Sequence, residues 1–102
     1  MSSQAFVYLL RCADGTLYTG YARNPRAREQ AHNTGRGARY TAGRRPVVLV
    51  YAESFEGIGD ALRREREVKK WPRKKKEALV AQRFPVDLQA TRTFSPRGPL
   101  GP

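Results

Sequence analysis

The chain has 102 residues, which is enough for one domain with a single modest hydrophobic core. Twenty lysines and arginines against nine aspartates and glutamates give a formal net charge of +11, which indicates an anionic partner. The single cysteine and single histidine exclude an internal disulfide and a Cys/His zinc cluster. No apolar run approaches the roughly 18 residues of a membrane span, and the N-terminus lacks the charged segment of a signal peptide. We therefore expect a cytoplasmic protein without a membrane partner.

Two apolar runs near the N-terminus, at 5–12 and 16–22, are rich in β-branched and aromatic residues. They flank Asp14-Gly15, a dipeptide that is typical of tight turns between antiparallel strands. The sequence therefore predicts a β-hairpin.

The length of the hairpin loop decides which side chains share a face. A two-residue loop would place Tyr8 and Tyr18 on opposite faces. A three-residue loop ending in a left-handed Gly15 would place Tyr8 opposite Gly20 and both phenols on one face, and we favour it because glycine stands third. Gly20 would then leave a gap beside Tyr8 where a ligand or a backbone segment could approach. Packing of both rings under a helix would account for the tyrosines equally well.

Asn24 and Pro25 have the character of a helix N-cap and a first helical residue, which predicts a helix over 25–33. Arg28 and His32 are four residues apart and therefore share a face of this helix. An arginine at the edge of the core can hold a phosphate with two hydrogen bonds, or it can form an ordinary salt bridge. A histidine in such a position, considered singly, is more often structural than catalytic.

The glycine- and arginine-rich segment 34–46 predicts a loop that leads to a third strand over 47–55. Charge runs are usually solvated faces, but the sum of the cations suits a phosphate backbone. We assign to nucleic-acid binding Gly20, the loop residues Arg36, Arg39, Arg44 and Arg45, and the helix residues Lys69 and Lys70.

A helical pattern covers 58–70, and Glu65 falls in the middle of its apolar stripe, between Ala61 and Val68. A buried charge costs several kcal/mol unless it is paired or coordinates a metal. A salt bridge to a nearby arginine would account for Glu65, but we favour a metal-binding or catalytic role. Glu67, on the solvent side, has the ordinary exposed position.

The C-terminal part of the chain predicts one more helix, opened by Pro72 and running toward Phe84. The segment 85–102 holds four of the seven prolines and has no periodicity. We therefore expect a domain over 1–84 and a flexible tail over 85–102.

Several spaced motifs occur in an order that resembles the GIY-YIG nuclease domain, especially its small stand-alone members. They are FVYLLRCADGTLYTGY, RAREQAHN, GARYTAGRRPVVLVY and ALRREREVKKW, and the resemblance covers roughly residues 5–80. It extends to the N-terminal catalytic domain of the nuclease component of the excision-repair complex. Three signature letters differ, because Phe6 replaces a glycine, and Val7 and Thr19 each replace an isoleucine.

The resemblance implies an α+β fold (α/β), in which helices flank a three-stranded antiparallel sheet. It also implies a divalent-metal-dependent phosphodiesterase that cuts nucleic acid, with DNA favoured over RNA, in repair or recombination. Glu65 falls at the position that would hold Mg²⁺ or Mn²⁺, and Arg28 at the catalytic arginine that would neutralise charge on the phosphate. Tyr18 would take a proton from the attacking water, while Tyr8 and His32 would orient water or share the proton transfer.

A basic nucleic-acid-binding module that does not cut is the alternative hypothesis. It is supported by the small size of the domain, the strong positive charge and the lack of a separate recognition domain in this sequence. The sequence leaves open which nucleic-acid structure is bound or cut, since no motif here encodes base contacts. It also leaves the oligomeric state open, with a monomer slightly favoured.

Overall fold

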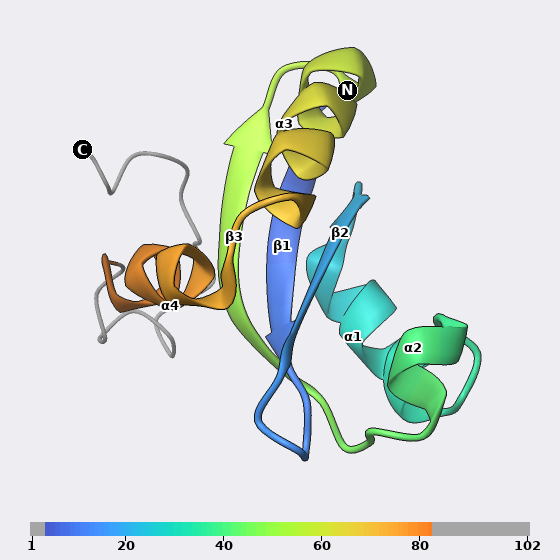
Figure 1. Cartoon of the computed structure of the whole chain (residues 1–102). Helices are drawn as coiled ribbons and strands as arrows, with labels where there is room; N and C mark the ends of the chain where they lie inside the picture. Colours follow the sequence, from blue (N-terminus) through green and yellow to red (C-terminus); the bar gives the residue numbers. More distant parts are fainter. Residues whose placement is uncertain (1–3, 83–102) are drawn as a thin grey trace.

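The computed structural model of the protein describes residues 4–82. In this part of the chain three strands form one antiparallel sheet, and four helices flank it (Figure 1). In chain order the elements are β1 (Ala5–Arg11), β2 (Leu17–Ala22), α1 (Pro25–Asn33), α2 (Arg39–Ala42), β3 (Val48–Phe55), α3 (Ile58–Lys69) and α4 (Arg73–Gln82). The strand order is β2-β1-β3, so β1, which is buried along most of its length, is central. The expected fold class is confirmed.

The hairpin between β1 and β2 has the three-residue loop that the sequence predicts. Cys12 donates its N–H to the carbonyl of Thr16 at 2.8 Å, and Gly15 has a left-handed φ of 89°. Tyr8 is therefore paired with Gly20 across the two strands. The same register puts both tyrosines on one face of the sheet.

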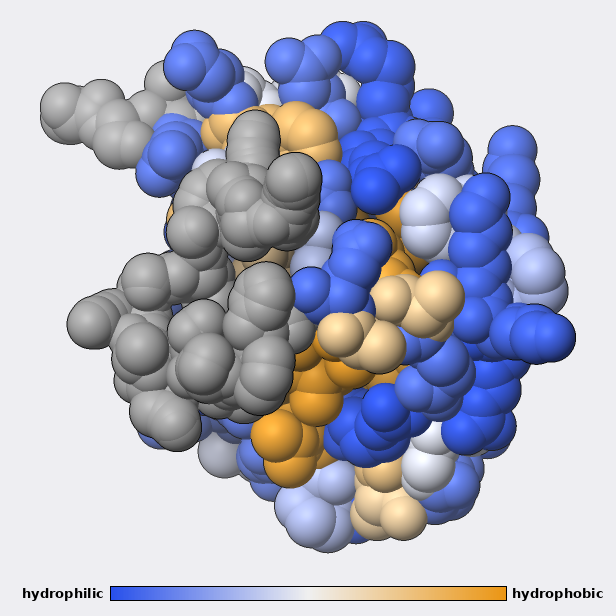
Figure 2. Space-filling view, turned by 90° about the vertical axis from the view of Figure 1, so that its left-hand side faces the viewer, coloured by the Kyte–Doolittle hydropathy of each residue, from blue (hydrophilic) through white to orange (hydrophobic). Residues whose placement is uncertain are grey.

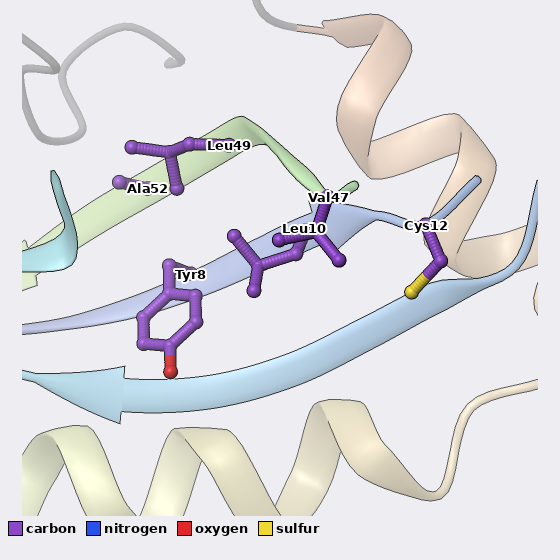
Figure 3. Packing of buried hydrophobic residues seen from close by; sticks show 6 residues of the cluster. All are labelled: Tyr8, Leu10, Cys12, Val47, Leu49 and Ala52. Carbon is purple, nitrogen blue, oxygen red and sulfur yellow. The ribbon is translucent and has the colours of Figure 1, made fainter. Parts of the chain in front are cut away.

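The face of the sheet that carries Tyr8 packs toward α1. Its buried apolar cluster consists of Tyr8, Leu10, Cys12, Val47, Leu49 and Ala52 (Figure 3). Helix α1 is held there largely by polar contacts, since the Asn33 side chain donates to the carbonyl of Val47 and accepts from its N–H. The Glu29 carboxylate accepts the N–H of Leu49 at 2.9 Å. These contacts also satisfy backbone groups at the start of β3.

The opposite face packs against α3 and α4. Helix α3 lies across β1 and β2 (Figure 1) and contributes Ala61 beside Val7, and Val68 beside Leu9. These small and branched side chains let the helix approach the sheet closely. Glu65 lies between them in sequence, on the same side of α3.

A β-bulge interrupts the pairing of β1 with β3. Leu9 pairs with Tyr51 and Leu10 pairs with Leu49, so Val50 is an extra residue on β3. The alternation of side chains shifts by one residue at this point. Leu49 and Ala52, which lie on either side of the bulge, can therefore both contribute to the apolar cluster that contains Tyr8.

The segment predicted as a loop after α1 contains the one-turn helix α2. The Arg45 guanidinium donates to the carbonyls of Ala42 at the end of α2 and Asn33 at the end of α1. Thr41 is buried and hydrogen-bonded to His32. Long-range contacts thus stabilise a turn that has no helical periodicity in the sequence. The other predicted elements agree to within two residues over 4–82, and the predicted end of the last helix at Phe84 and the tail over 85–102 lie outside the described residues.

Helix α4 is attached to both the sheet and the hairpin. The two terminal guanidinium nitrogens of Arg11 donate to the Glu77 carboxylate at 2.6 and 2.8 Å, and Arg73 donates to the carbonyl of Gly15. Leu79 and Val80 pack against the cluster around Leu9 and Val68. Figure 2 shows this side of the molecule, where apolar groups lie between hydrophilic ones. Within residues 4–82 no helix is long and apolar enough to cross a membrane.

Candidate active site

A pocket of about 460 Å³ lies where residues of β1, β2, α1 and α3 meet. Because β2 is an edge strand, helices from both faces of the sheet can reach this place. Four of the five predicted catalytic residues line the pocket, and the fifth, His32, is hydrogen-bonded to Tyr8 behind it. The lining consists of Tyr8, Tyr18, Gly20, Tyr21, Ala22, Arg28, Glu65 and Lys69.

Tyr8 extends from the central strand across β2 toward the pocket. Figure 3 shows its phenol pointing toward β2, and only 1% of the residue is exposed. A Cβ atom on Gly20 would lie 2.5 Å from the Tyr8 hydroxyl oxygen. Gly20 is therefore required for the phenol to cross β2. The ring of Tyr8 itself occupies the space that a side chain at position 20 would fill, and both Tyr8 and Gly20 line the pocket.

His32 is fully buried, at 0% exposure, and its ring also lies against a glycine. A Cβ atom on Gly37 would overlap the imidazole. Gly37 therefore has a role that the sequence pattern did not reveal, because the contact joins a loop to a helix. The glycine-rich composition of the loop was the only signal.

We assign the tautomer of His32 from its hydrogen bonds. Thr41 donates its hydroxyl to the carbonyl of Ala38 at 3.1 Å, so its oxygen accepts from Nδ1 of His32 at 2.7 Å. Nε2 then carries no proton and accepts from the Tyr8 hydroxyl at 3.3 Å. A chain of hydrogen bonds thus runs from the pocket into the protein.

Burial keeps both partners of this hydrogen bond neutral. It raises the pKa of the Tyr8 phenol, while a hydrogen bond from Arg28 opposes that rise. Burial lowers the pKa of His32, and the nearby Arg28 charge lowers it further. The lone pair on Nε2 is therefore available at neutral pH.

Tyr18 is held by aromatic neighbours on two sides. Its ring centroid lies 5.0 Å from that of His32 and 5.9 Å from that of Tyr40. The guanidinium of Arg44 stacks on Tyr40 at 4.0 Å and pairs with Asp14 at 3.0 Å. The loop around α2 is thereby tied to the hairpin. The sequence pattern did not identify Tyr40 because no local spacing links it to Tyr18.

Glu65 is buried as predicted, with 8% of the residue exposed. Its carboxylate is paired with the Lys69 ammonium one turn later, at 3.0 Å from Oε2 to Nζ. In the described residues its counter-ion is therefore a lysine, whereas an arginine was the alternative suggested by the sequence. Both Glu65 and Lys69 line the pocket.

Comparison with known sequences identifies the family. The profile of the GIY-YIG catalytic domain matches residues 4–78, which includes every residue of the pocket. The chain belongs to the GIY-YIG catalytic domain family. The resemblance seen in the sequence is thus confirmed.

The relatives are small proteins of similar length. A UPF0213 protein of Staphylococcus aureus (strain N315) is 53% identical over 78 residues, which are 76% of this chain and 95% of that protein. The solution structure of the UPF0213 protein BH0048 of Bacillus halodurans is 45% identical, with a TM-score of 0.50 over 76% of this chain and 83% of that one. The solution structure of EF2693 from E. faecalis is 40% identical, with a TM-score of 0.53 over 79% and 88% of the two chains.

Five of the basic residues that the sequence assigns to nucleic-acid binding lie outside the pocket of this GIY-YIG domain, and they fall into two groups. Arg44 and Arg45 are engaged in the intramolecular contacts described above. Arg36, Arg39 and Lys70 are exposed and lie outside the pocket lining. These three side chains can meet a phosphate backbone without first breaking an ion pair described for residues 4–82.

The donor set of the GIY-YIG pocket fits one type of metal. Residues 4–82 contain no group of three or more His, Cys, Asp or Glu residues that could form a cage. Glu65 is the pocket's single carboxylate. Hard ions such as Mg²⁺ and Mn²⁺ are often held by one carboxylate together with waters and substrate phosphates, and a cage is not required. The pocket suits such an ion better than zinc.

Proposed function

We propose that this GIY-YIG protein is an endonuclease that hydrolyses phosphodiester bonds in nucleic acid with the help of Mg²⁺ or Mn²⁺. DNA is the substrate that we favour, with repair or recombination in the cytoplasm as its setting. One observation carries the proposal: a buried carboxylate, an arginine and a phenol bonded to a neutral histidine all meet at one pocket. The strongly basic composition supports a polyanionic substrate.

Arg28 is the residue that we assign to the scissile phosphate. Its side chain lines the pocket together with Tyr8 and Glu65. Its positive charge opposes the burial that raises the pKa of Tyr8 and contributes to the lowered pKa of His32, so it lies beside the groups that would carry out the reaction. A planar guanidinium can donate two hydrogen bonds to phosphate oxygens and stabilise negative charge as it develops there.

The proton transfer is assigned to the pair Tyr8 and His32. The attacking water would give a proton to the Tyr8 oxygen as the phenol proton passes to Nε2 of His32. Neutral His32 can accept that proton on Nε2, because its single ring proton lies on Nδ1, where it is bonded to Thr41. The sequence favoured Tyr18 as the base, but the hydrogen bond to Nε2 favours Tyr8. Tyr18 would then orient the water or the substrate.

Glu65 is the residue that would hold the metal. When bound, the ion would supply Lewis-acid polarisation of the phosphate and stabilise the leaving oxygen. The packing of α3 on the sheet fixes the position of the carboxylate, because Ala61 and Val68 on the same side of the helix are fully buried. The protein thus contributes a rigid, single-carboxylate ligand.

The test is a nicking assay on a panel of structured DNA and RNA with Mg²⁺, Mn²⁺ or EDTA. We expect cleavage with metal and none with EDTA. Glu65→Gln keeps the size of the side chain but removes its charge, so cleavage should fall at least about 10²-fold, as on loss of one preorganised electrostatic group. Glu67→Gln is the control, because Glu67 is exposed on the same helix. It should cleave at the rate of the parent.

The same experiment separates the enzyme from a binding module. Nucleic-acid binding should survive in the Glu65→Gln variant, since the dispersed cations remain. Equal cleavage by Glu65→Gln and the parent would refute the metal assignment. A parent protein that binds every substrate and cuts none would support the non-cutting module.

A further inference from the structure

The ion pair between Glu65 and Lys69 differs from the other ion pairs of the protein. The others described for residues 4–82 are all made by arginines. Lys69 is 50% exposed at its side chain, whereas the carboxylate that it contacts belongs to a residue at 8% exposure. A half-exposed cation therefore covers a buried anion at the wall of the pocket.

The buried carboxylate needs this positive charge. A carboxylate removed from water is destabilised unless a cation or hydrogen-bond donors compensate it. Lys69 is the cation paired with Glu65 in the described residues, at 3.0 Å. Without a metal ion, Lys69 is therefore the cation that compensates the buried carboxylate.

Lys69 and a divalent ion would compete for the same carboxylate. Two cations within a few ångströms repel strongly where water is partly excluded. A lysine can leave such a position readily, because its ammonium is a point charge on a flexible stem and makes no bidentate pair. The half-exposed side chain has solvent on one side into which it can move.

We propose that Lys69 is a displaceable counter-ion, which neutralises Glu65 in the metal-free protein and moves to a substrate phosphate when Glu65 binds a divalent ion. The inference rests on the proposed function, because it takes Glu65 as the metal ligand. Lys69 lines the same pocket as Arg28, so a released ammonium stays close to the place assigned to the phosphate. Metal binding and nucleic-acid binding then strengthen each other, as reciprocal coupling requires.

The first test measures metal affinity without nucleic acid. The full-length protein, Lys69→Gln, Lys69→Met and Lys70→Gln are titrated with Mn²⁺, and free Mn²⁺ is followed by EPR spectroscopy. Loss of the competing ammonium should tighten Mn²⁺ binding about fivefold in both Lys69 variants. This change corresponds to the upper end of the free energies typical of one exposed ion pair. Lys70→Gln removes the same charge from the next, exposed residue and should change the affinity less than about twofold.

The second test measures coupling. Binding of a labelled oligonucleotide is followed by fluorescence anisotropy with EDTA and with Ca²⁺, for the parent and Lys69→Gln. In the parent, the divalent ion should strengthen binding, because Lys69 becomes free to contact phosphate. The gain should be smaller in Lys69→Gln. Circular dichroism checks that each variant is folded.

The outcomes distinguish this inference from the proposed function. Equal Mn²⁺ affinity in the parent and both Lys69 variants would overturn the counter-ion role, while Glu65 could still be the metal ligand. If Glu65→Gln binds Mn²⁺ as tightly as the parent, the metal assignment itself fails and the inference fails with it. Tighter Mn²⁺ binding with an unchanged gain in nucleic-acid affinity would refute the transfer of Lys69 to phosphate.

Discussion

The side chain of Thr19 lies on β2 opposite Leu9, and 3% of the residue is exposed. Its hydroxyl is buried and has no hydrogen-bond partner within residues 4–82. An unsatisfied buried hydroxyl costs free energy of folding, because it has lost water and gained nothing in exchange. Thr19 also stands where the GIY-YIG signature has an isoleucine, so this chain carries a polar atom in an apolar position.

We expect Thr19→Val to raise the free energy of unfolding by about 1 kcal/mol, since the shape is kept and the unpaired hydroxyl is removed. Chemical denaturation of the two proteins measures the difference. Thr41→Val is the matched control, because Thr41 is also buried but its hydroxyl bonds to both His32 and Ala38. That variant should lose stability. A Thr19→Val protein less stable than the parent would show that its hydroxyl has a partner.

The residues of the candidate site could be predicted from the sequence to different degrees. Glu65 was found because one helical periodicity places it among apolar residues. Tyr8 and Gly20 were paired correctly because Gly15 reveals the loop length. Gly37 could not be found, since its contact with His32 joins two segments by tertiary packing. The partner of a buried charge also depends on side-chain conformation, which no periodicity encodes.

At the scale of elements, α1 is attached to the sheet in an unusual way. Its buried residues are Pro25 and His32, so the helix has little apolar surface to bury. The neutral imidazole, bonded to Tyr8 and Thr41, takes the place of an apolar anchor. The attachment of α1 therefore depends in part on the protonation state of His32, besides the contacts of Asn33 and Glu29 with the start of β3.

This dependence predicts acid lability. The pKa of His32 is lowered in the folded protein, so above its unfolded value of about 6.5 neither state binds a proton there. As the pH falls below about 6.5, the unfolded chain takes up the proton first, and the free energy of unfolding decreases. Denaturation at pH 7.5 and at pH 5.5, about one unit on either side of that value, measures the loss.

His32→Gln is the variant that isolates this effect. The glutamine side chain does not titrate, so the free energy of unfolding of this variant should change less than that of the parent between about pH 7.5 and about pH 5.5. This comparison holds even if the variant is less stable than the parent at both pH values. The positive charge of Arg28 contributes to the lowered pKa of His32 and is present in both proteins. Identical losses in the two proteins would assign the acid lability to other groups.

The boundaries of most elements follow from local signals, but two features of the architecture do not. Helix α2 depends on contacts of Thr41 and Arg45 with α1, and the region has no apolar periodicity. The bulge at Val50 brings Leu49 and Ala52 to the same face of the sheet, where both pack in the cluster around Tyr8. Both features are consequences of packing between distant segments, so a local pattern cannot predict them.

At the scale of the whole molecule, the excess positive charge should govern binding to nucleic acid. We expect affinity to fall linearly on a log-log plot of salt, with a slope of about −0.9 for each duplex phosphate neutralised. Arg39→Gln should reduce the slope by about one if this exposed residue contacts a phosphate. Filter binding at several salt concentrations measures both values.

Arg44→Gln provides the comparison, since the charge of Arg44 is already paired with Asp14. It should leave the slope nearly unchanged. An affinity that does not vary between low and moderate salt would contradict the role assigned to the basic surface.

The pocket combines residues that are far apart along the chain. Tyr8, Tyr18 and Arg28 belong to the first third of the sequence, whereas Glu65 belongs to α3. During translation, the cationic and phenolic groups leave the ribosome first, and the carboxylate follows only after the third strand is made. Under the proposed function, a chain that stops before α3 carries the arginine and the phenols but lacks the residue that would hold the metal. Such a chain should not cut nucleic acid.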